Sequence, residues 1–146
     1  MCGIFAYIGK RTDAPEIVFE GLKLLEYRGY DSWGISYIDK QVLKIEKHTG
    51  KIGSSKLSKI TKTNIALAHT RWATHGGITD ENAHPHLDCK NQIAVIHNGI
   101  IENYHELKLK LSKNNHAYKS ETDTEVVSHL IEDELKTKGI RQATFD

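Results

Sequence analysis

Short apolar stretches, several of them alternating with polar residues, recur along the chain and predict β-strands. The first stretch begins directly after Cys2, so this side chain is expected at the start of a strand. Two alternating stretches flank the polar residues 39–41, which predicts a hairpin. The expected strands are residues 3–8, 33–38, 42–47, 65–69 and 93–97.

Apolar residues spaced three and four positions apart predict helices between these strands and after them. Asp13 is expected to cap the first helix, with Pro15 in its first turn. Thr122 and Glu125 stand three apart, as in a capping box, and Gly139 suits the position that follows a helix. The expected helices are residues 13–27, 54–60 and 104–112, a helix between Thr122 and Gly139, and the start of another over residues 140–146.

The segment between the strands at residues 65–69 and 93–97 is long and polar. It is rich in His, Gly, Thr and Asn. Long loops between strong strands are usually functional, because a loop that only connects two strands tends to be short. The pattern as a whole predicts a mixed α and β domain with its chemistry in this loop.

Composition limits the classes of protein to which the chain can belong. The 146 residues are 38% hydrophobic and 27% charged, which is typical of one globular domain. Lys and Arg total 20 against 19 Asp and Glu, so the net charge of +1 does not indicate a nucleic-acid or membrane-surface partner. We expect no membrane span and a cytoplasmic location, because no segment approaches the ~18 consecutive apolar residues of a span.

Cys2 is the first candidate for chemistry. Removal of Met1 would leave a terminal residue that carries both a thiol, with a pKa near ~8.5, and an α-amine, with a pKa of ~7.7 to 8.0. The amine could then take the proton of the thiol, as in enzymes that use an N-terminal nucleophile. Considered alone, Cys2 is more simply an ordinary strand cysteine.

A metal site is the competing interpretation of the nine histidines. His84, His86 and Cys89 lie within a short span and include soft ligands. A structural zinc site usually needs four ligands, however, and no CxxC or HxxxH pattern completes this set. We therefore expect no metal site and no cofactor, and Cys89 is interpreted as an inert or surface thiol.

Several strings of residues occur together in a specific order. They are Met1-Cys2-Gly3, Glu26-Tyr27-Arg28-Gly29-Tyr30-Asp31-Ser32, His69-Thr70-Arg71-Trp72-Ala73-Thr74-His75-Gly76, Asn82-Ala83-His84-Pro85-His86, His97-Asn98-Gly99-Ile100-Ile101-Glu102-Asn103 and Ser120-Glu121-Thr122-Asp123-Thr124-Glu125. In order and spacing they resemble the glutaminase domain of the glutamine-fructose-6-phosphate aminotransferase family, a class II amidotransferase with an N-terminal nucleophile. The resemblance extends from Met1 to about Gly139.

The resemblance implies an α+β fold, an αββα sandwich of the N-terminal-nucleophile hydrolase type. It implies hydrolysis of the L-glutamine side-chain amide through a Cys2 thioester, and transfer of the ammonia to fructose 6-phosphate by sugar-isomerase domains of a homo-oligomeric enzyme. Those domains are absent from residues 1–146, which we expect to be a glutaminase domain that is incomplete at its C-terminal side. Alone, it is expected to be poorly active or unstable.

The resemblance also assigns roles to residues. Asn98 and Gly99 would form the oxyanion hole, although Asn-Gly is also a common turn dipeptide. Arg71 would bind the glutamine α-carboxylate and Asp123 its α-ammonium, whereas by residue type alone a loop Arg is more often a solvated charge or a surface ion pair, and such an Asp more often caps the following helix. The glutamine lid would contain Trp72, Thr74 and His75, His86 would position the loop, and Arg28 would support the active site.

Two alternatives stay open. Class II amidotransferases that make asparagine or phosphoribosylamine also use an N-terminal Cys and an Asn-Gly oxyanion hole, but they lack the His-Thr-Arg-Trp and Asn-Ala-His-Pro-His strings. A catalytically silent regulatory or metal-binding module is the alternative from another class, and retention of Met1 would favour it.

Overall fold

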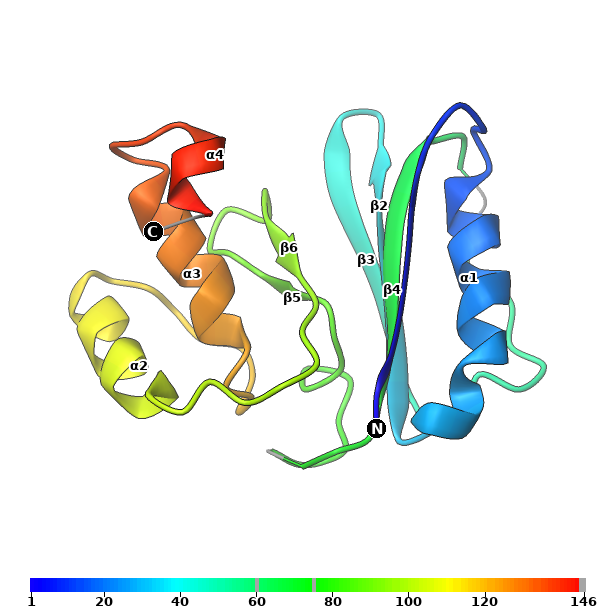
Figure 1. Cartoon of the computed structure of the whole chain (residues 1–146), viewed down its shortest axis with the longest axis horizontal. Coiled ribbons are helices and arrows are strands. Elements are labelled where there is room, and N and C mark those ends of the chain that lie inside the picture. The colour runs from blue at the N-terminus through cyan, green and yellow to red at the C-terminus, as the bar shows by residue number, and fades with distance from the viewer. Residues whose placement is uncertain (60, 75, 145–146) are drawn as a thin grey trace.

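The computed structural model describes residues 1–59, 61–74 and 76–144 (Figure 1). Strands dominate the first half of the chain and helices the second half. The elements are β1 (Gly3–Ile8), α1 (Ala14–Leu24), a 3-10 turn (Glu26–Arg28), β2 (Ser32–Asp39), β3 (Val42–Thr49), β4 (Ile65–Arg71), β5 (His86–Leu87), β6 (Ala94–Val95), α2 (Tyr104–Lys113), α3 (Glu125–Glu134) and α4 (Ile140–Ala143).

The larger sheet has four antiparallel strands in the order β1-β4-β2-β3. β2 and β3 form the expected hairpin, and Lys40 and Gln41 of its turn have positive φ angles of 49° and 65°. β4 enters between β1 and β2, so that Thr70 lies opposite both Gly3 and Trp33. This register brings the chain start, which precedes β1, beside the end of β4.

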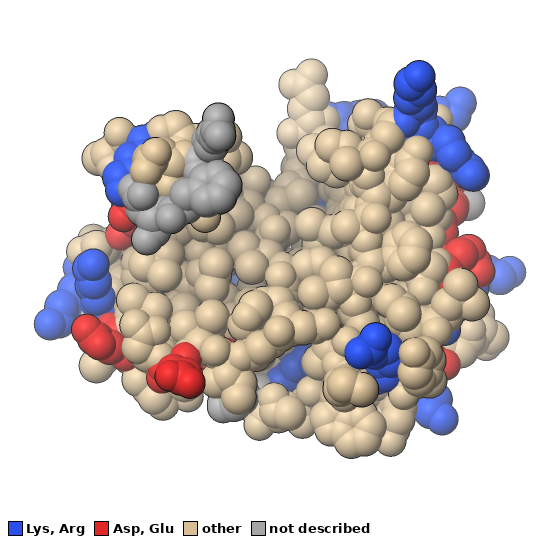
Figure 2. All heavy atoms as spheres, viewed as in Figure 1, with Lys and Arg blue, Asp and Glu red and all other residues tan. Residues whose placement is uncertain are grey.

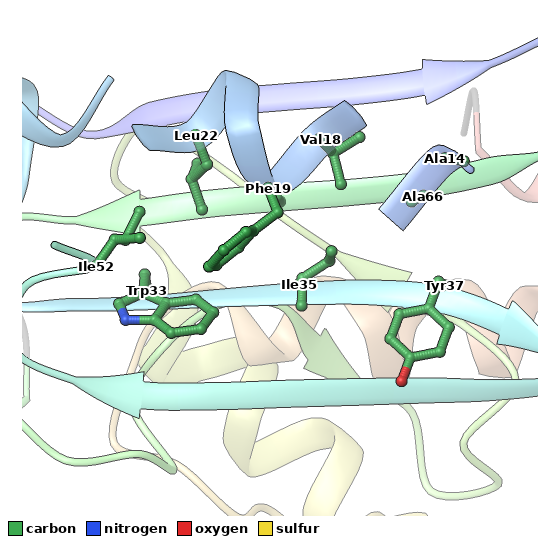
Figure 3. Packing of buried hydrophobic residues seen from close by; sticks show 10 residues of the cluster. Ala14, Val18, Phe19, Leu22, Trp33, Ile35, Tyr37, Ile52 and Ala66 are labelled. Carbon is green, nitrogen blue, oxygen red and sulfur yellow. The ribbon is translucent and has the colours of Figure 1, made fainter. Parts of the chain in front are cut away.

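α1 covers one face of this sheet, and the main hydrophobic core lies between them (Figure 3). Residues of α1 on one face are buried against inward-pointing residues of β2 and β4, because side chains alternate along a strand and recur every three to four residues on a helix. Trp33 is 2% exposed and packs on Phe19 with a ring-centroid distance of 5.3 Å. The core consists of Ala14, Val18, Phe19, Leu22, Trp33, Ile35, Tyr37, Ile52, Ala66 and Ala68.

A second layer of structure packs on the opposite face of the sheet. The short strands β5 and β6 pair antiparallel, and α3 covers them on the outside with α2 beside it (Figure 1). The order of layers is therefore helix, sheet, sheet, helix, which confirms the expected αββα sandwich.

Most of the central part of the face shown in Figure 2 lacks charged side chains, and charges of both signs lie around it.

Gly34 allows the second layer to approach the sheet closely. A Cβ atom at this position of β2 would lie 2.2 Å from the carbonyl oxygen of His84 and 3.0 Å from that of Glu46. Both neighbours are backbone atoms, so neither can rotate away. The absence of a side chain at Gly34 thus lets the Asn82-to-His86 string lie directly on the sheet.

Two expected elements differ in the structure. The described part of residues 54–60 is not a helix, because the Ser58 backbone N–H and hydroxyl donate instead to the Glu46 carboxylate at 3.1 Å and 2.6 Å; Ile60 lies outside the described residues. The strand expected over residues 93–97 is reduced to Ala94–Val95. The Asp88 carboxylate accepts the Ile93 N–H at 2.7 Å, which prevents that N–H from pairing in a strand.

The expected helix caps are also wrong in detail. Asp13 precedes α1, but its carboxylate accepts from the Arg11 side chain rather than from the helix N–H groups. Glu125 reaches back to the Ser120 N–H at 2.7 Å rather than to Thr122. Gly139 has an extended conformation and precedes α4, so it does not end α3 in a left-handed turn. Local spacing therefore located these helices but not the partners of their ends.

The helices can also be compared with the bilayer. The longest of them has 11 residues, whereas a span needs about 20 apolar residues. Among the described residues, every helix is too short or too polar to span a membrane.

Candidate active site

The Cys2 side chain lies where the larger sheet meets the loop that follows β4. Pairing of Gly3 with Thr70 places Cys2 level with the end of β4. The Trp72 backbone N–H donates to the Cys2 Sγ at 3.3 Å, so a backbone donor already faces the sulfur atom. Cys2 is partly exposed and is a free thiol.

Asn98 is held against Cys2 by a short chain of hydrogen bonds. Its Nδ2 donates to the Cys2 carbonyl oxygen at 3.1 Å, and its Oδ1 lies 2.9 Å from the His69 Nε2. Burial lowers the pKa of His69 to about 4, although the hydrogen bond with Asn98 opposes the shift. A neutral imidazole has one N–H, and Nε2 must carry it because Oδ1 can only accept. His69 therefore fixes which way the Asn98 amide points.

Gly99 follows Asn98 and lies beside the ring of His97. A Cβ atom at Gly99 would lie 2.7 Å from the His97 Nε2. The Nδ1 of the same His97 ring lies 3.4 Å from the Thr124 hydroxyl oxygen. The space next to the Gly99 backbone is thus shaped by His97 and leaves no room for a side chain.

Arg71 ends β4 and is only 4% exposed. Its Nη1 donates to the Gly77 carbonyl at 3.0 Å and its Nη2 to the Gly76 carbonyl at 3.5 Å, so it also holds the loop that follows β4. Burial lowers the pKa of Arg71, and the nearby Cys2, Asp31 and Asp123 act in the opposite direction.

Asp123 lies across the site from Arg71, 5% exposed. Its Oδ2 accepts the Ile101 N–H at 2.7 Å, and this bond ties the segment after Gly99 to the start of α3. Thr124, not Asp123, is the residue that precedes α3, and its side chain does not cap the helix. The alternative interpretation of Asp123 as a simple helix cap is therefore wrong.

Cys2 stands where two hollows meet. The smaller, a pocket, has a volume of about 40 Å³, and the larger, a wider cleft, has a volume of about 360 Å³. Both are lined by Cys2, Trp72, Thr74 and Gly99. The small pocket brings Arg71 and Asp123 together, whereas the wider cleft is lined by Asn98. The further residues that line the small pocket are His69, His84, His97, Thr122 and Thr124. The further residues that line the wider cleft are Met1, Arg28 and Ile100.

The loop after β4 covers the small pocket. The Trp72 ring is 44% exposed and contacts the Tyr30 ring edge-on at 5.4 Å, so it is not part of the hydrophobic core. Asn82 fastens the far end of the loop, because its Nδ2 donates to the Gly77 carbonyl at 3.0 Å and its Oδ1 accepts the Glu121 N–H at 2.9 Å. His75 lies outside the described residues.

Two further expected site residues lie at the edge of the site. His86 is 2% exposed and does not line the small pocket, but its Nε2 lies 2.9 Å from the hydroxyl of Thr122, which does. Burial lowers the pKa of His86. Arg28 follows α1 and lines the wider cleft, with its Nη2 3.8 Å from the Met1 sulfur. Both residues are placed to support the site from outside the small pocket.

Sequence reasoning missed several polar residues of the small pocket. His69 and His84 stack with their ring centroids 4.2 Å apart, His69 meets the Asn98 amide, and Thr122 and Thr124 come from the segment just before α3. The clustering of five histidines in mid-chain was visible in the sequence. Nothing in that pattern showed which of them would meet Asn98, because the contact depends on strands far apart in the chain.

With this geometry, the comparisons with known proteins decide the family. The model of the glutamine amidotransferase domain family matches residues 36–140. The chain belongs to the glutamine amidotransferase domain family. It is 54% identical over 99% of its length to glutamine-fructose-6-phosphate aminotransferase (isomerizing) of Methanococcus maripaludis, and 53% identical over 99% to that of Pyrococcus horikoshii. It spans 24% and 25% of those two proteins.

A solved amidotransferase structure has the same fold. The glutamine phosphoribosylpyrophosphate amidotransferase of B. subtilis, complexed with ADP and GMP, superimposes with a TM-score of 0.79 at 30% identity. The match covers 98% of this chain and 31% of the other. This amidotransferase domain therefore shares its architecture with an enzyme whose name gives a different acceptor.

Proposed function

We propose that the chain is the glutaminase part of a glutamine-fructose-6-phosphate aminotransferase and hydrolyses the side-chain amide of L-glutamine to glutamate and ammonia. One observation carries the proposal: Cys2 lies where a pocket containing Arg71 and Asp123 meets a cleft lined by Asn98. A candidate nucleophile, two side chains of opposite charge and an amide donor thus lie around one point. The roles of these residues stay predictions.

The proposed reaction begins after removal of Met1. The Cys2 thiol gives its proton to the α-amine of the same residue, directly or through water, and the thiolate attacks the side-chain carbonyl carbon of glutamine. The carbon–nitrogen bond then breaks, and ammonia leaves with the proton held by the α-ammonium. Water attacks the resulting thioester, releases glutamate and restores the thiol.

Asn98 is proposed to stabilise the oxyanion of the tetrahedral intermediates together with the Gly99 N–H. An amide nitrogen has two N–H groups, and one of those of Asn98 is used by the Cys2 carbonyl. The second is available to the developing oxyanion, and a donor of this kind contributes about 2.7 to 4 kcal/mol. The hydrogen bond from His69 supports this role, because it keeps the Nδ2 side of the amide turned towards Cys2.

Arg71 and Asp123 are proposed to bind the α-carboxylate and α-ammonium of glutamine. The planar guanidinium suits a carboxylate, and a buried site strengthens both ion pairs. The pocket of about 40 Å³ is much smaller than the wider cleft of about 360 Å³. Glutamine binding therefore requires the loop of Trp72 and Thr74, to which His75 would belong, to move outwards and then close again over the substrate.

Transfer of ammonia to fructose 6-phosphate is proposed only for an assembly that also contains a sugar-isomerising part. The chain spans about a quarter of the length of the curated relatives it matches, and their names supply this acceptor. We also propose that the full enzyme is a homo-oligomer. A cytoplasmic location is proposed because the mechanism needs a free thiol at Cys2, and the cytosol keeps thiols reduced. The expected domain boundaries, a glutaminase over residues 1–146 that is incomplete at its C-terminal side, stay a prediction.

Labelling with the glutamine analogue 6-diazo-5-oxo-norleucine tests the glutaminase proposal. We expect one adduct, which peptide mass mapping places on Cys2 and which excess glutamine prevents. Cys2→Ser should abolish the adduct, and Arg71→Lys should slow its formation, because an ammonium cannot form the two-pronged contact. Cys89→Ser is the matched thiol control and should leave labelling unchanged. An adduct on Cys89, or labelling that glutamine does not suppress, would contradict the proposal.

Synthesis of asparagine or phosphoribosylamine remains the second candidate, because the B. subtilis amidotransferase shares the fold. The higher identity to the fructose 6-phosphate enzymes favours the first candidate. A trans assay would separate them. The chain would be mixed with the isomerase part of the M. maripaludis relative, and glucosamine 6-phosphate should form from glutamine and fructose 6-phosphate.

A further inference from the structure

We propose that Cys89, His116, His129 and Glu132 bind one zinc-like divalent transition-metal ion, at a structural site separate from the catalytic cleft. Each of these residues offers one ligand atom, and the four atoms lie within 4.8 Å of one another. None of the four lines either hollow that contains Cys2. The proposal does not depend on the glutaminase function.

The four residues come from three separate segments of the second layer. Cys89 lies in the turn between β5 and β6, and His116 in the connection between α2 and α3. His129 and Glu132 are three positions apart in α3 and therefore share one face of the helix. The fold brings the segments together, although 26 residues separate Cys89 from His116.

The distances between the ligand atoms fit a tetrahedral ion. The Cys89 Sγ lies 3.6 Å from the Nδ1 atoms of both His116 and His129, which are 3.2 Å apart. The Glu132 Oε2 lies 3.2 Å and 3.7 Å from the same two nitrogen atoms. Tetrahedral zinc with ordinary bond lengths requires separations of about 3.6 Å between sulfur and nitrogen and about 3.3 Å between two nitrogens.

The outer nitrogen of His116 lies within hydrogen-bond distance of a carboxylate, as is usual for metal-bound histidine: its Nε2 lies 2.8 Å from the Asp133 Oδ1. The His129 Nε2 lies 3.7 Å from the Glu125 Oε1, which is near a carboxylate but too far for a hydrogen bond. If these outer nitrogens carry the protons, both Nδ1 lone pairs point inwards, towards Glu132 and the sulfur. Such converging acceptors repel one another unless a cation, or extra protons, lie between them.

The donor set indicates zinc rather than magnesium or calcium. One thiolate and two imidazoles are ligands preferred by Zn²⁺ and Co²⁺, whereas Mg²⁺ and Ca²⁺ prefer oxygen atoms. Four protein ligands fill the tetrahedron, which is typical of a structural site. His116, His129 and Glu132 are 7%, 1% and 6% exposed, whereas Cys89 is exposed and leaves a path by which the ion enters.

Such an ion would strengthen the least regular part of the fold. β5 and β6 have two residues each, so few backbone hydrogen bonds join these two strands to each other. A metal joins their turn directly to α3 and to the α2–α3 connection. Sequence reasoning combined Cys89 with His84 and His86 instead, but the structure stacks His84 on His69 and places His86 against Thr122. The expectation of no metal site is thus replaced by this proposal.

Cobalt substitution tests the site in the 146-residue chain after removal of metal with a chelator. We expect one equivalent of Co²⁺ to give the intense visible bands of tetrahedral cobalt together with a thiolate-to-cobalt charge-transfer band, and Zn²⁺ to abolish both. Cys89→Ser should eliminate the charge-transfer band and weaken binding by more than about tenfold. Cys2→Ser is the matched control and should keep the full spectrum.

A second pair of variants tests the histidines. His116→Ala should bind Co²⁺ more than about tenfold more weakly, whereas His105→Ala, at an exposed position in α2, should bind it like the parent chain. Zn²⁺ should also raise the melting temperature of the parent chain and of His105→Ala, but not that of Cys89→Ser. Three results would overturn the proposal: no Co²⁺ binding by the parent chain, a charge-transfer band that survives Cys89→Ser, or one that Cys2→Ser removes.

Discussion

His69, Asn98 and Cys2 form a connected unit in which each residue sets the orientation of the next. The imidazole N–H bonds to the Asn98 Oδ1, and the Asn98 Nδ2 bonds to the Cys2 carbonyl. The strings around Cys2 and Asn98 allowed both residues to be predicted from the sequence. The part played by His69 could not be predicted, because it arises only when β4 and the segment after β6 lie side by side.

Asn98→Ala tests the amide donor. The substitution removes the N–H that is proposed to face the oxyanion, so the single-turnover rate of glutamate formation should fall by about 10²- to 10³-fold. The fold should persist, since the side chain is near the surface. A rate within a factor of about three of the parent chain's, with an unchanged circular dichroism spectrum, would rule out this role.

His69→Leu tests whether the imidazole acts only by positioning Asn98. Losing one buried hydrogen bond costs about 1.4 kcal/mol, which corresponds to a roughly tenfold lower rate of the same single-turnover reaction. The KM for glutamine should not rise. His69→Gln retains a donor and should recover part of the rate. Equal rates for the Leu and Gln variants would show that the hydrogen bond to Asn98 is not what matters.

At the scale of elements, contacts between layers decide what the sequence pattern leaves open. The β2–β3 hairpin was predictable because alternation and a polar turn are local signals. The helix expected over residues 54–60 was wrong because Glu46, in a neighbouring strand, takes the Ser58 N–H. Gly34 shows the same dependence on distant contacts, since only the approach of His84 explains why the strand has a glycine there.

Gly34→Ala tests the contact between β2 and the Asn82-to-His86 string. The added methyl group would meet the His84 carbonyl oxygen at 2.2 Å, so the two layers must separate or the strand must shift. We expect the free energy of unfolding in urea to fall by about 1 to 3 kcal/mol. Gly139→Ala is the matched control, because a Cβ at that position meets no atom within 4 Å. Similar losses for both variants would contradict the close approach.

The whole molecule buries a stack of histidines between its two layers, and this should make its stability depend on pH. Burial lowers the pKa of His69 to about 4 and also lowers those of His84 and His86. As pH falls below the unfolded pKa of about 6.5, the unfolded chain binds protons that the folded chain does not. Stability is therefore highest above that pH and decreases towards pH 4, by up to about 1.4 kcal/mol per pH unit for each histidine.

Urea unfolding between about pH 7.5 and pH 4.5, with chelator present to exclude metal effects, measures this slope. His69→Leu should reduce the slope by about one proton, whereas His105→Ala should not change it. A free energy of unfolding that is constant over this range would show that the buried histidines become protonated without cost.

Layer order and strand order are also properties of the whole molecule, and only part of them followed from the sequence. The αββα arrangement was implied by the resemblance of the motifs, not by the periodicity of the strands. The insertion of β4 between β1 and β2, which places Cys2 beside Arg71, has no local signal. For the same reason the cluster of Cys89, His116, His129 and Glu132 was invisible, because its members come from three distant segments.

We propose that the thiol and the α-amine of Cys2 act together once Met1 is removed. The most direct test compares the chain with Met1 removed against the same chain with Met1 retained, verified by intact mass, in their rates of Cys2 labelling by 6-diazo-5-oxo-norleucine. We expect rapid, glutamine-protected labelling only when the Cys2 amine is free. Equal labelling of the two forms would contradict it.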